Sequence, residues 1–291
     1  MKIKGLRWWV IGLIMVITII NYLDRGTLNY MWVTNVEYQL VNEFTSGSKT
    51  NEAVYNSEAN SYELKNKKGE IRVQLAEHIF TKADGRIVVN REGIAYDLGI
   101  INSQMTPDDA SKEAKDILGT ITIFFMIAYG FSQLFSGKLY DKIGTRKGFV
   151  VSVLIWGTAD ALTSLARGKI SLTGFRMMLG LGEAGPWPGA TKSNAEWFPQ
   201  KERAFAQGLF GAAASIGSIL APVIILMLYL WLGWKLTFIV VGSLGILWVI
   251  PWLIINKKGP KEHPWITDEE RHYILSNQPE AQSATADRGK S

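Results

Sequence analysis

Apolar residues are concentrated in six long runs, and polar residues fill the segments between them. Each run has about 18 to 27 residues, enough for a helix to cross a hydrocarbon core of about 30 Å. We therefore predict membrane-spanning helices at Trp8–Trp32, Ile117–Ser136, Phe149–Ala166, Leu172–Ala190, Ala204–Leu230 and Leu236–Ile255. The fourth run is the least apolar, because it contains charged residues and a proline. These residues would be costly against lipid and should face protein or water instead.

The first two runs are separated by a polar segment at 33–116. Tyr62–Leu75 alternates apolar and polar residues around a Lys-Gly turn and predicts a β-hairpin, and Gly85–Asn90 predicts a further strand. Thr106–Asp109 combines a cap residue, a first-turn proline and early acids, so a helix should start there and lead into the second span. We predict a small folded α+β insert. A flexible linker is the alternative, since the segment has few large aliphatic residues with which to build a core.

The composition narrows the possible functions. Although 47% of the residues are hydrophobic, the mean hydropathy is only +0.08, so apolar and polar segments are segregated along the chain. The absence of cysteine excludes disulfides, zinc–cysteine sites and thiol nucleophiles. The three histidines lie in polar segments and no nucleophile pair or metal-ligand cluster is evident. An intramembrane enzyme is therefore disfavoured, and no cofactor is expected.

Basic residues predict the orientation of the spans. With a cytoplasmic amino terminus, twelve basic residues fall in inner segments and three in short outer loops, which the positive-inside rule favours. The inner set is Lys2, Lys4, Arg7, Lys138, Lys142, Arg146, Lys147, Lys201, Arg203, Lys257, Lys258 and Lys261, and the outer set is Arg167, Lys169 and Lys235. Tryptophans would then form an inner belt (Trp8, Trp9, Trp252) and an outer belt (Trp32, Trp231, Trp234). Both termini should be cytoplasmic, and the isoelectric point of 9.2 reflects this topology and requires no nucleic-acid partner.

The amino terminus could be mistaken for a cleaved signal peptide, because three basic residues precede its apolar run. No small-x-small cleavage site follows, however, and apolar residues resume beyond Asn21–Arg25. We therefore expect an uncleaved first span.

Ionisable residues inside the spans are candidates for function, because burying them in a membrane is expensive. The first span contains Asp24 and Arg25 within Asn21–Arg25. The alternative is that both lie near the outer interface and are simply hydrated.

The fourth span places Arg176, Gly180 and Glu183 at positions i, i+4 and i+7, on one helix face. The two charges are separated by two turns, about 10 Å, and we expect Gly180 to leave space for a ligand. Counted from the outer end, Arg176 should lie at the depth of Arg25, with Glu183 two turns further in. This pattern predicts an anion site above a proton acceptor, or alternatively a static Arg176–Glu183 ion pair that holds the bundle together.

The segment Gly137–Lys147, here called the signature loop, joins the second and third predicted spans. Such a connection must turn sharply, and Gly137 and Gly144 would supply the backbone freedom. Asp141 can cap a helix start or pair with Arg146. The string Gly-x-Leu-x-Asp-Lys-x-Gly-x-Arg-Lys resembles the cytoplasmic loop signature of the major facilitator superfamily. A basic loop that only sets orientation is the alternative.

Further strings sharpen this resemblance. Asn21–Arg25, the Arg176–Glu183 spacing, Glu196–Pro199 with Glu202–Ala204, and His263–Thr267 together resemble the anion:cation symporter family, close to its hexuronate and sugar-acid (galactonate, glucarate) permeases. The resemblance implies a small organic anion as substrate and protons as the coupling ion. It assigns proton coupling to Asp24 and Glu183, and substrate contact to Tyr22, Arg25, Tyr129 and Arg176, with Tyr129 resting on position alone.

Two features depart from that family: the outer insert, and a chain that ends after six spans where the family has twelve in two halves. The expected fold is an all-α membrane protein, the six-helix amino-terminal half of a major facilitator fold, with an extracytoplasmic α+β insert between helices 1 and 2. Its parts are 1–32 (first helix), 33–116 (insert), 117–256 (helices 2–6) and 257–291 (a truncated cytoplasmic linker). The carboxy-terminal half would be a missing partner.

Small residues on the fifth span could form a contact surface for the missing carboxy-terminal half. Ala213, Gly217 and Ala221 recur every fourth residue and would let another helix approach closely. We expect this stripe to be uncovered, as a surface for the other half; alternatively it packs within the six helices.

The sequence therefore predicts an inner-membrane, proton-coupled symporter of a hexuronate or other sugar acid, present as an amino-terminal half. The alternatives are a membrane-anchored sensor or scaffold that uses the insert, or a fragment that is inactive on its own.

Overall fold

The computed structural model describes residues 2–32, 34–41, 52–58, 61–65, 71–75, 79–81, 86–91, 93–101, 105 and 107–278. The chain divides into two compact units: Met1–Tyr30 together with Ile121–Ser291, and Met31–Thr120. Helix α3 contributes to both, since it runs from Pro107 to Thr163.

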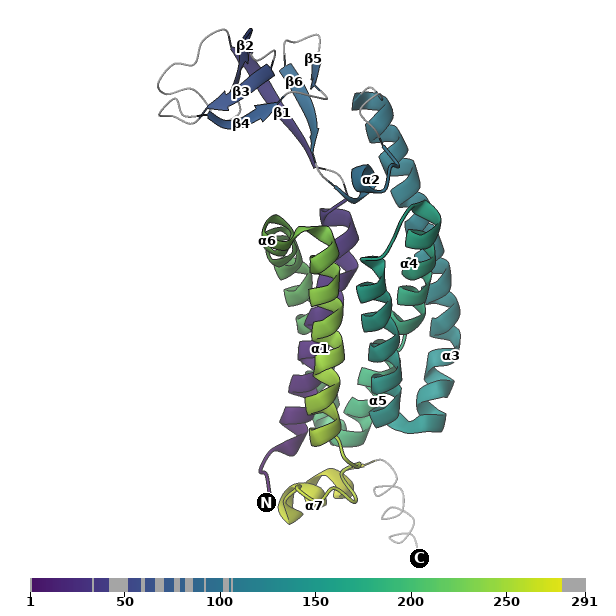
Figure 1. Ribbon diagram of the computed structural model, residues 1–291. Helices are drawn as coiled ribbons and strands as arrows, with labels where there is room; N and C mark the ends of the chain where they lie inside the picture. The colour runs from purple at the N-terminus through teal and green to yellow at the C-terminus, as the bar shows by residue number, and fades with distance from the viewer. Residues whose placement is uncertain are drawn as a thin grey trace, which may run out of the picture. The chain divides into compact units, whose positions relative to one another are not determined.

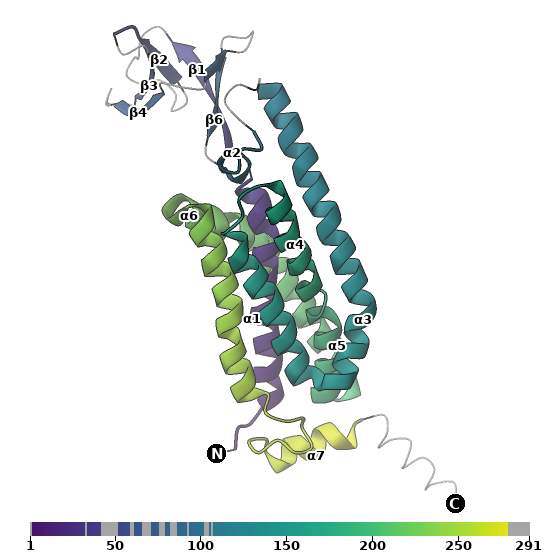
Figure 2. The ribbon, with the colours of Figure 1, turned by 45° about the vertical axis from the view of Figure 1, so that its right-hand side comes forward.

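The first unit is a bundle of helices. It contains α1 (Leu6–Tyr30), the greater part of α3, α4 (Lys169–Glu183), α5 (Pro186–Trp197), α6 (Gln200–Ile255) and α7 (Asp268–Ser276). The purple α1 lies beside the green α6 in both views (Figures 1 and 2). Within the described residues, three helical stretches are long and apolar enough to cross a membrane: Leu6–Tyr30, Asp109–Thr163 and Gln200–Ile255.

The two longest helices each contain a turn at a glycine. Gly144 in α3 has φ 78° and ψ 163°, and Gly233 in α6 has φ 73° and ψ 170°. Only glycine adopts such angles at little cost, so each element consists of two helical segments joined at that residue. The second and third predicted runs lie on either side of Gly144, and the fifth and sixth on either side of Gly233. The expectation that Gly137 also supplies the turn is wrong, because Gly137 lies within the helix and does not have a positive φ.

The fourth predicted run, Leu172–Ala190, is not one helix. Helix α4 ends at Glu183 and α5 begins at Pro186. Proline has no amide hydrogen to donate and restricts the residue before it, so a break just ahead of Pro186 is the physical consequence of the sequence. Glu183 consequently occupies the last turn of α4.

The small-residue stripe of α6 is covered, which corrects the expectation that it is free for another half. Ala213, Gly217 and Ala221 are all buried. A Cβ placed on Gly217 would lie 2.8 Å from the Tyr22 Cβ and 3.0 Å from the Ile19 carbonyl oxygen. The stripe therefore allows α1 to pack closely on α6.

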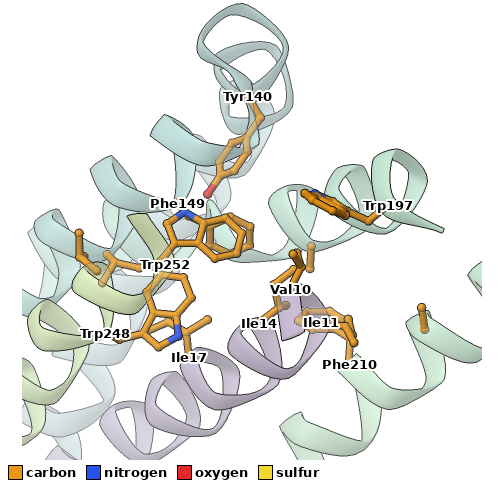
Figure 3. Close-up of a cluster of buried hydrophobic side chains, with 14 of the residues drawn as sticks. Val10, Ile11, Ile14, Ile17, Tyr140, Phe149, Trp197, Phe210, Trp248 and Trp252 are labelled. Carbon is orange, nitrogen blue, oxygen red and sulfur yellow. The ribbon is translucent and has the colours of Figure 1, made fainter. Parts of the chain in front are cut away.

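Large apolar side chains fill the bundle (Figure 3). Trp248 and Trp252 stack with ring centroids 5.0 Å apart, and the Trp252 indole donates to the Arg146 carbonyl at 3.0 Å. Trp252 is fully buried, so its placement in an inner aromatic belt is wrong, whereas Trp8 and Trp9 are 39% and 61% exposed.

The segment after α6 folds back onto the start of α1. Ile3 and Ile266 form a parallel bridge, and the Ile3 amide donates to the Trp265 carbonyl at 2.7 Å. On α7, the buried Glu270 accepts hydrogen bonds from the amides of Gly5 and Leu6 at 2.9 and 3.0 Å. A carboxylate thereby satisfies free amides at the positive end of α1.

We predict that Glu270→Ala lowers the melting temperature of the purified protein. Loss of a helix cap and exposure of buried amides typically cost about 1–3 kcal/mol, and about 2–4 °C is lost for each kcal/mol. Thermal unfolding followed by tryptophan fluorescence measures the change. Glu269→Ala is the control, because Glu269 is exposed on the same helix; equal melting temperatures for both variants would contradict the capping role.

The second unit contains a six-stranded sheet in the order β4-β3-β2-β1-β6-β5. Its strands are β1 (Thr34–Val41), β2 (Glu52–Asn56), β3 (Ser61–Lys65), β4 (Ile71–Leu75), β5 (Ile79–Thr81) and β6 (Arg86–Arg91). Only β1 and β2 pair in parallel; the other neighbours are antiparallel. β3 and β4 pair across the predicted hairpin, with Tyr62 opposite Leu75, while its Lys-Gly turn lies outside the described residues. Strands β1, β2 and β5 were not predicted from the sequence.

A short helix, α2 (Ile94–Asp97), follows the sheet. The Ile94 amide donates to the Met31 carbonyl at 3.0 Å, and the Trp32 indole donates to the Ala114 carbonyl of α3 at 2.8 Å. Trp32 is buried, so it does not belong to an exposed outer belt. These bonds hold the start and the end of the second unit together.

Candidate functional site

Five charged residues from α1, α3 and α4 form a cluster inside the helical unit, in which the Arg25 side chain is 28% exposed and the other four are buried: Asp24, Arg25, Asp160, Arg176 and Glu183. The three carboxylates are fully buried, and Arg176 is 4% exposed. We call this group the charge cluster. Buried charges of this kind are costly unless they are paired or serve a function.

Arg25 and Glu183 form the ion pair of this cluster. The Arg25 Nε donates to Glu183 Oε2 at 2.6 Å. The Arg25 guanidinium also lies over the rings of Tyr22 and Tyr129, 5.3 and 4.9 Å from their centroids. The sequence placed Glu183 two turns further in than Arg25 and did not predict this pair. The alternative of a static Arg176–Glu183 pair is wrong, because Glu183 pairs with Arg25.

Arg176 has a different environment. Its guanidinium lies over the Phe238 ring, 5.3 Å from the centroid, and its Nε and Nη2 have no acceptor among the described residues. Together with Arg25, it lines a cavity of about 170 Å³ whose other walls are Leu28, Asn29, Ile121, Thr122, Phe125 and Met126. A buried guanidinium at a cavity wall suits a planar carboxylate, to which it can donate two parallel hydrogen bonds.

Gly180 does not leave space for a ligand, which corrects the sequence expectation. A Cβ at this position would lie 2.7 Å from the Phe125 carbonyl oxygen and 3.1 Å from the Tyr129 amide nitrogen. The missing side chain lets the backbones of α3 and α4 approach each other. The cavity lies instead beside Arg176 and Arg25.

Asp160 is the member of the charge cluster that was not predicted from the sequence. Both of its carboxylate oxygens, like both of Asp24, have no donor among the described residues. The two side chains are within hydrogen-bonding reach of each other. A signal was present in the sequence, because Asp160 is a lone acid inside the apolar run Phe149–Ala166.

The signature loop residues lie apart from the charge cluster and contact other elements. Asp141 accepts from Lys192 Nζ at 2.6 Å, and Arg146 donates to the Leu253 carbonyl at 3.2 Å. Of the two roles considered for Asp141, the pair with Arg146 is wrong: Asp141 contacts α5, and Arg146 contacts the end of α6. Neighbouring Thr145 donates to Glu196 at 2.8 Å, and burial raises the pKa of the Glu196 carboxyl, an effect that this hydroxyl partly opposes.

Membrane-length helices with ionisable side chains buried around a cavity are typical of secondary transporters. The chain belongs to the Major Facilitator Superfamily, whose family model matches residues 14–284. This membership makes it an integral membrane protein of a transporter family.

Named relatives confirm the resemblance to sugar-acid permeases. The chain is 35% identical over 154 residues to the hexuronate transporter of Escherichia coli, a match that covers 53% of this chain and 35% of the relative. It is 35% identical over 157 residues to a probable sulfoacetate transporter of Cupriavidus necator, covering 54% and 36%. Against a probable L-galactonate transporter of Escherichia coli it is 32% identical over 157 residues, covering 54% and 34%. These matches span about a third of each relative's length.

Solved structures show the same fold. A bacterial homologue of the human lysosomal transporter Spinster, in an inward-facing and unoccupied conformation, matches with a TM-score of 0.54 and 17% identity. The match covers 90% of this chain and 45% of that one. At this identity the likeness supports the major facilitator fold alone.

Proposed function

We propose that this chain is the amino-terminal, anion-binding half of a proton-coupled symporter for a hexuronate or another sugar acid. The observation that carries the proposal is the buried Arg176, whose guanidinium nitrogens Nε and Nη2 lack an acceptor in the described part of the chain and lie beside a cavity of about 170 Å³. An apolar cavity of about 150 Å³ accepts benzene, so this one has room for the carboxylate end of a sugar acid and part of its ring.

Arg25 can join Arg176 in holding the anion once it leaves Glu183. Protonation of Glu183 would neutralise the carboxylate that now accepts from Arg25 at 2.6 Å. The released guanidinium lines the same cavity as Arg176, and Tyr22 and Tyr129 flank it. Anion and proton would then bind together, because each removes a charge that opposes the other.

Asp24 is the second proposed coupling residue. It lies next to Arg25 in the chain and is fully buried. A proton at Asp24 would lower the net negative charge buried beside Arg176 while the cavity opens first to one face of the membrane and then to the other. Movement of this half against a second six-helix half would complete transport.

The experiment that tests the proposal is binding of galacturonate by the purified chain in lipid nanodiscs, measured by isothermal titration calorimetry. We expect saturable binding of galacturonate and none of galactose, which has the same ring but no carboxylate. Equal binding of the two sugars, or no binding of galacturonate, would remove the anion-site assignment and favour a scaffold or sensor role.

The proposed topology places the protein in the inner membrane, with both termini cytoplasmic and the insert 33–116 outside. Exposed apolar side chains such as Leu134, Ile219 and Val223 would face lipid. The Gly144 turn would be cytoplasmic.

This topology can be tested with single cysteines, because the chain has none of its own. A membrane-impermeant maleimide should label Glu58→Cys in intact cells and leave Lys142→Cys unlabelled until the membrane is permeabilised; both native residues are exposed. Labelling of Lys142→Cys alone in intact cells would invert the orientation.

A further inference from the structure

Asp24 on α1 and Asp160 on α3 are neighbouring carboxylates that lack the hydrogen-bond donors that two ionised acids would need. Both side chains are fully buried, and their four oxygens have no donor among the described residues. Yet the side chains are within hydrogen-bonding reach of each other. Two carboxylates cannot bond to each other unless one carries a proton, and two adjacent buried negative charges are strongly disfavoured.

The net charge of the charge cluster depends on whether this pair holds a proton. Asp24 is close to Arg25 and Arg176, and Asp160 is close to Arg176 and Glu183. The cluster therefore contains three carboxylates from α1, α3 and α4, and two guanidiniums from α1 and α4. With every acid ionised its net charge is −1, and one proton makes it neutral, which is the inexpensive state for a buried group of charges.

The Glu183 carboxylate is a poorer position for that proton, because its Oε2 already accepts a charged hydrogen bond from Arg25 at 2.6 Å, although its Oε1 has no donor among the described residues. Asp24 and Asp160 have no such donor. We propose that Asp24 and Asp160 share one proton at neutral pH before any anion binds, which makes Asp160 the third residue of the proton site.

The shared proton does not depend on the proposed function, but its consequence for coupling does. A monoanion beside Arg176 adds one negative charge to a cluster that the shared proton has already neutralised. A second proton, on Glu183, then restores neutrality and releases Arg25. The shared proton is accordingly a resident of the site, and the transported proton is the one that enters with the anion.

Infrared spectroscopy of the purified chain in nanodiscs, with no anion added, tests the shared proton. At neutral pH the parent should show the carbonyl stretch of a protonated carboxylic acid, and Asp160→Asn should lose it, because Asp24 then receives a hydrogen bond from the amide and ionises. Asp24→Asn should lose the band in the same way. Asp160→Glu should keep it, since a carboxyl group is restored at that position.

Asp141→Asn is the matched control and should keep the band, because Asp141 is exposed and pairs with Lys192 away from the cluster. Persistence of the band in Asp160→Asn would show that Asp24 is protonated alone and would overturn the proposal, as would absence of the band in the parent. Galacturonate titration of the same samples is a separate readout. Failure to bind would therefore count against the proposed function and leave the shared proton as measured.

Discussion

Replacement of Arg176 by lysine should weaken galacturonate binding by about 10- to 100-fold, the equivalent of one charge-assisted hydrogen bond worth about 1.5–3 kcal/mol. Lysine keeps the positive charge but lacks the planar fork that matches a carboxylate. The loss should be large because Arg176 Nε and Nη2 have no protein acceptor among the described residues, so the bound anion is their expected partner. Calorimetric titration of parent and variant in nanodiscs measures the change.

Arg167→Lys provides the control, because Arg167 is exposed in the segment between α3 and α4. Its affinity for galacturonate should equal that of the parent. Near-parental affinity in Arg176→Lys would remove Arg176 from the anion site and leave its charge as a structural component of the bundle.

Replacement of Glu183 by glutamine should make galacturonate binding independent of pH. In the parent, binding of the anion takes up a proton, so affinity should fall about tenfold for each pH unit through the range in which the free protein has lost that proton and the complex still holds it. Glutamine is uncharged like the protonated acid and leaves Arg25 without its ion-pair partner. The variant should therefore bind tightly across the range in which the parent weakens.

Glu196→Gln tests whether loss of a glutamate elsewhere in the bundle would have the same effect; Glu196 is half-buried. Glu196 accepts a hydrogen bond from Thr145 at 2.8 Å and lies outside the charge cluster. Its substitution should leave the pH dependence of the parent intact. If Glu183→Gln keeps that dependence, Glu183 is only a structural partner of Arg25 and the coupling role fails.

The features readable from the sequence are those that depend on local composition. The apolar runs follow from the thickness of a membrane, and Gly144 was identifiable because a sharp connection between helices needs a positive φ. The helix start at Pro107 also follows from local signals. Gly137 shows the limit of this reasoning, since the same residue type continues the helix a few residues earlier.

Partners across helices could not be read in the same way. The sequence placed Arg176 and Glu183 on one face of one helix, but the partner of Glu183 is Arg25, 158 positions away in the chain. Similarly, Asp141 pairs with Lys192 and not with the nearby Arg146. Such pairings depend on how α1, α3, α4 and α5 pack, which hydrophobic periodicity does not specify. Asp160 was visible as an intramembrane acid, but its proximity to Asp24 required the fold.

The central claim is that the chain binds one organic anion together with one proton. Calorimetric titration of galacturonate into the nanodisc-embedded chain, at one pH in two buffers of different ionisation enthalpy, tests it most directly. The difference between the two observed enthalpies gives the number of protons taken up. We predict an uptake of one proton for each galacturonate bound, as the charge count of the cluster requires. Identical enthalpies in the two buffers would show that the anion binds without a proton and would contradict the account.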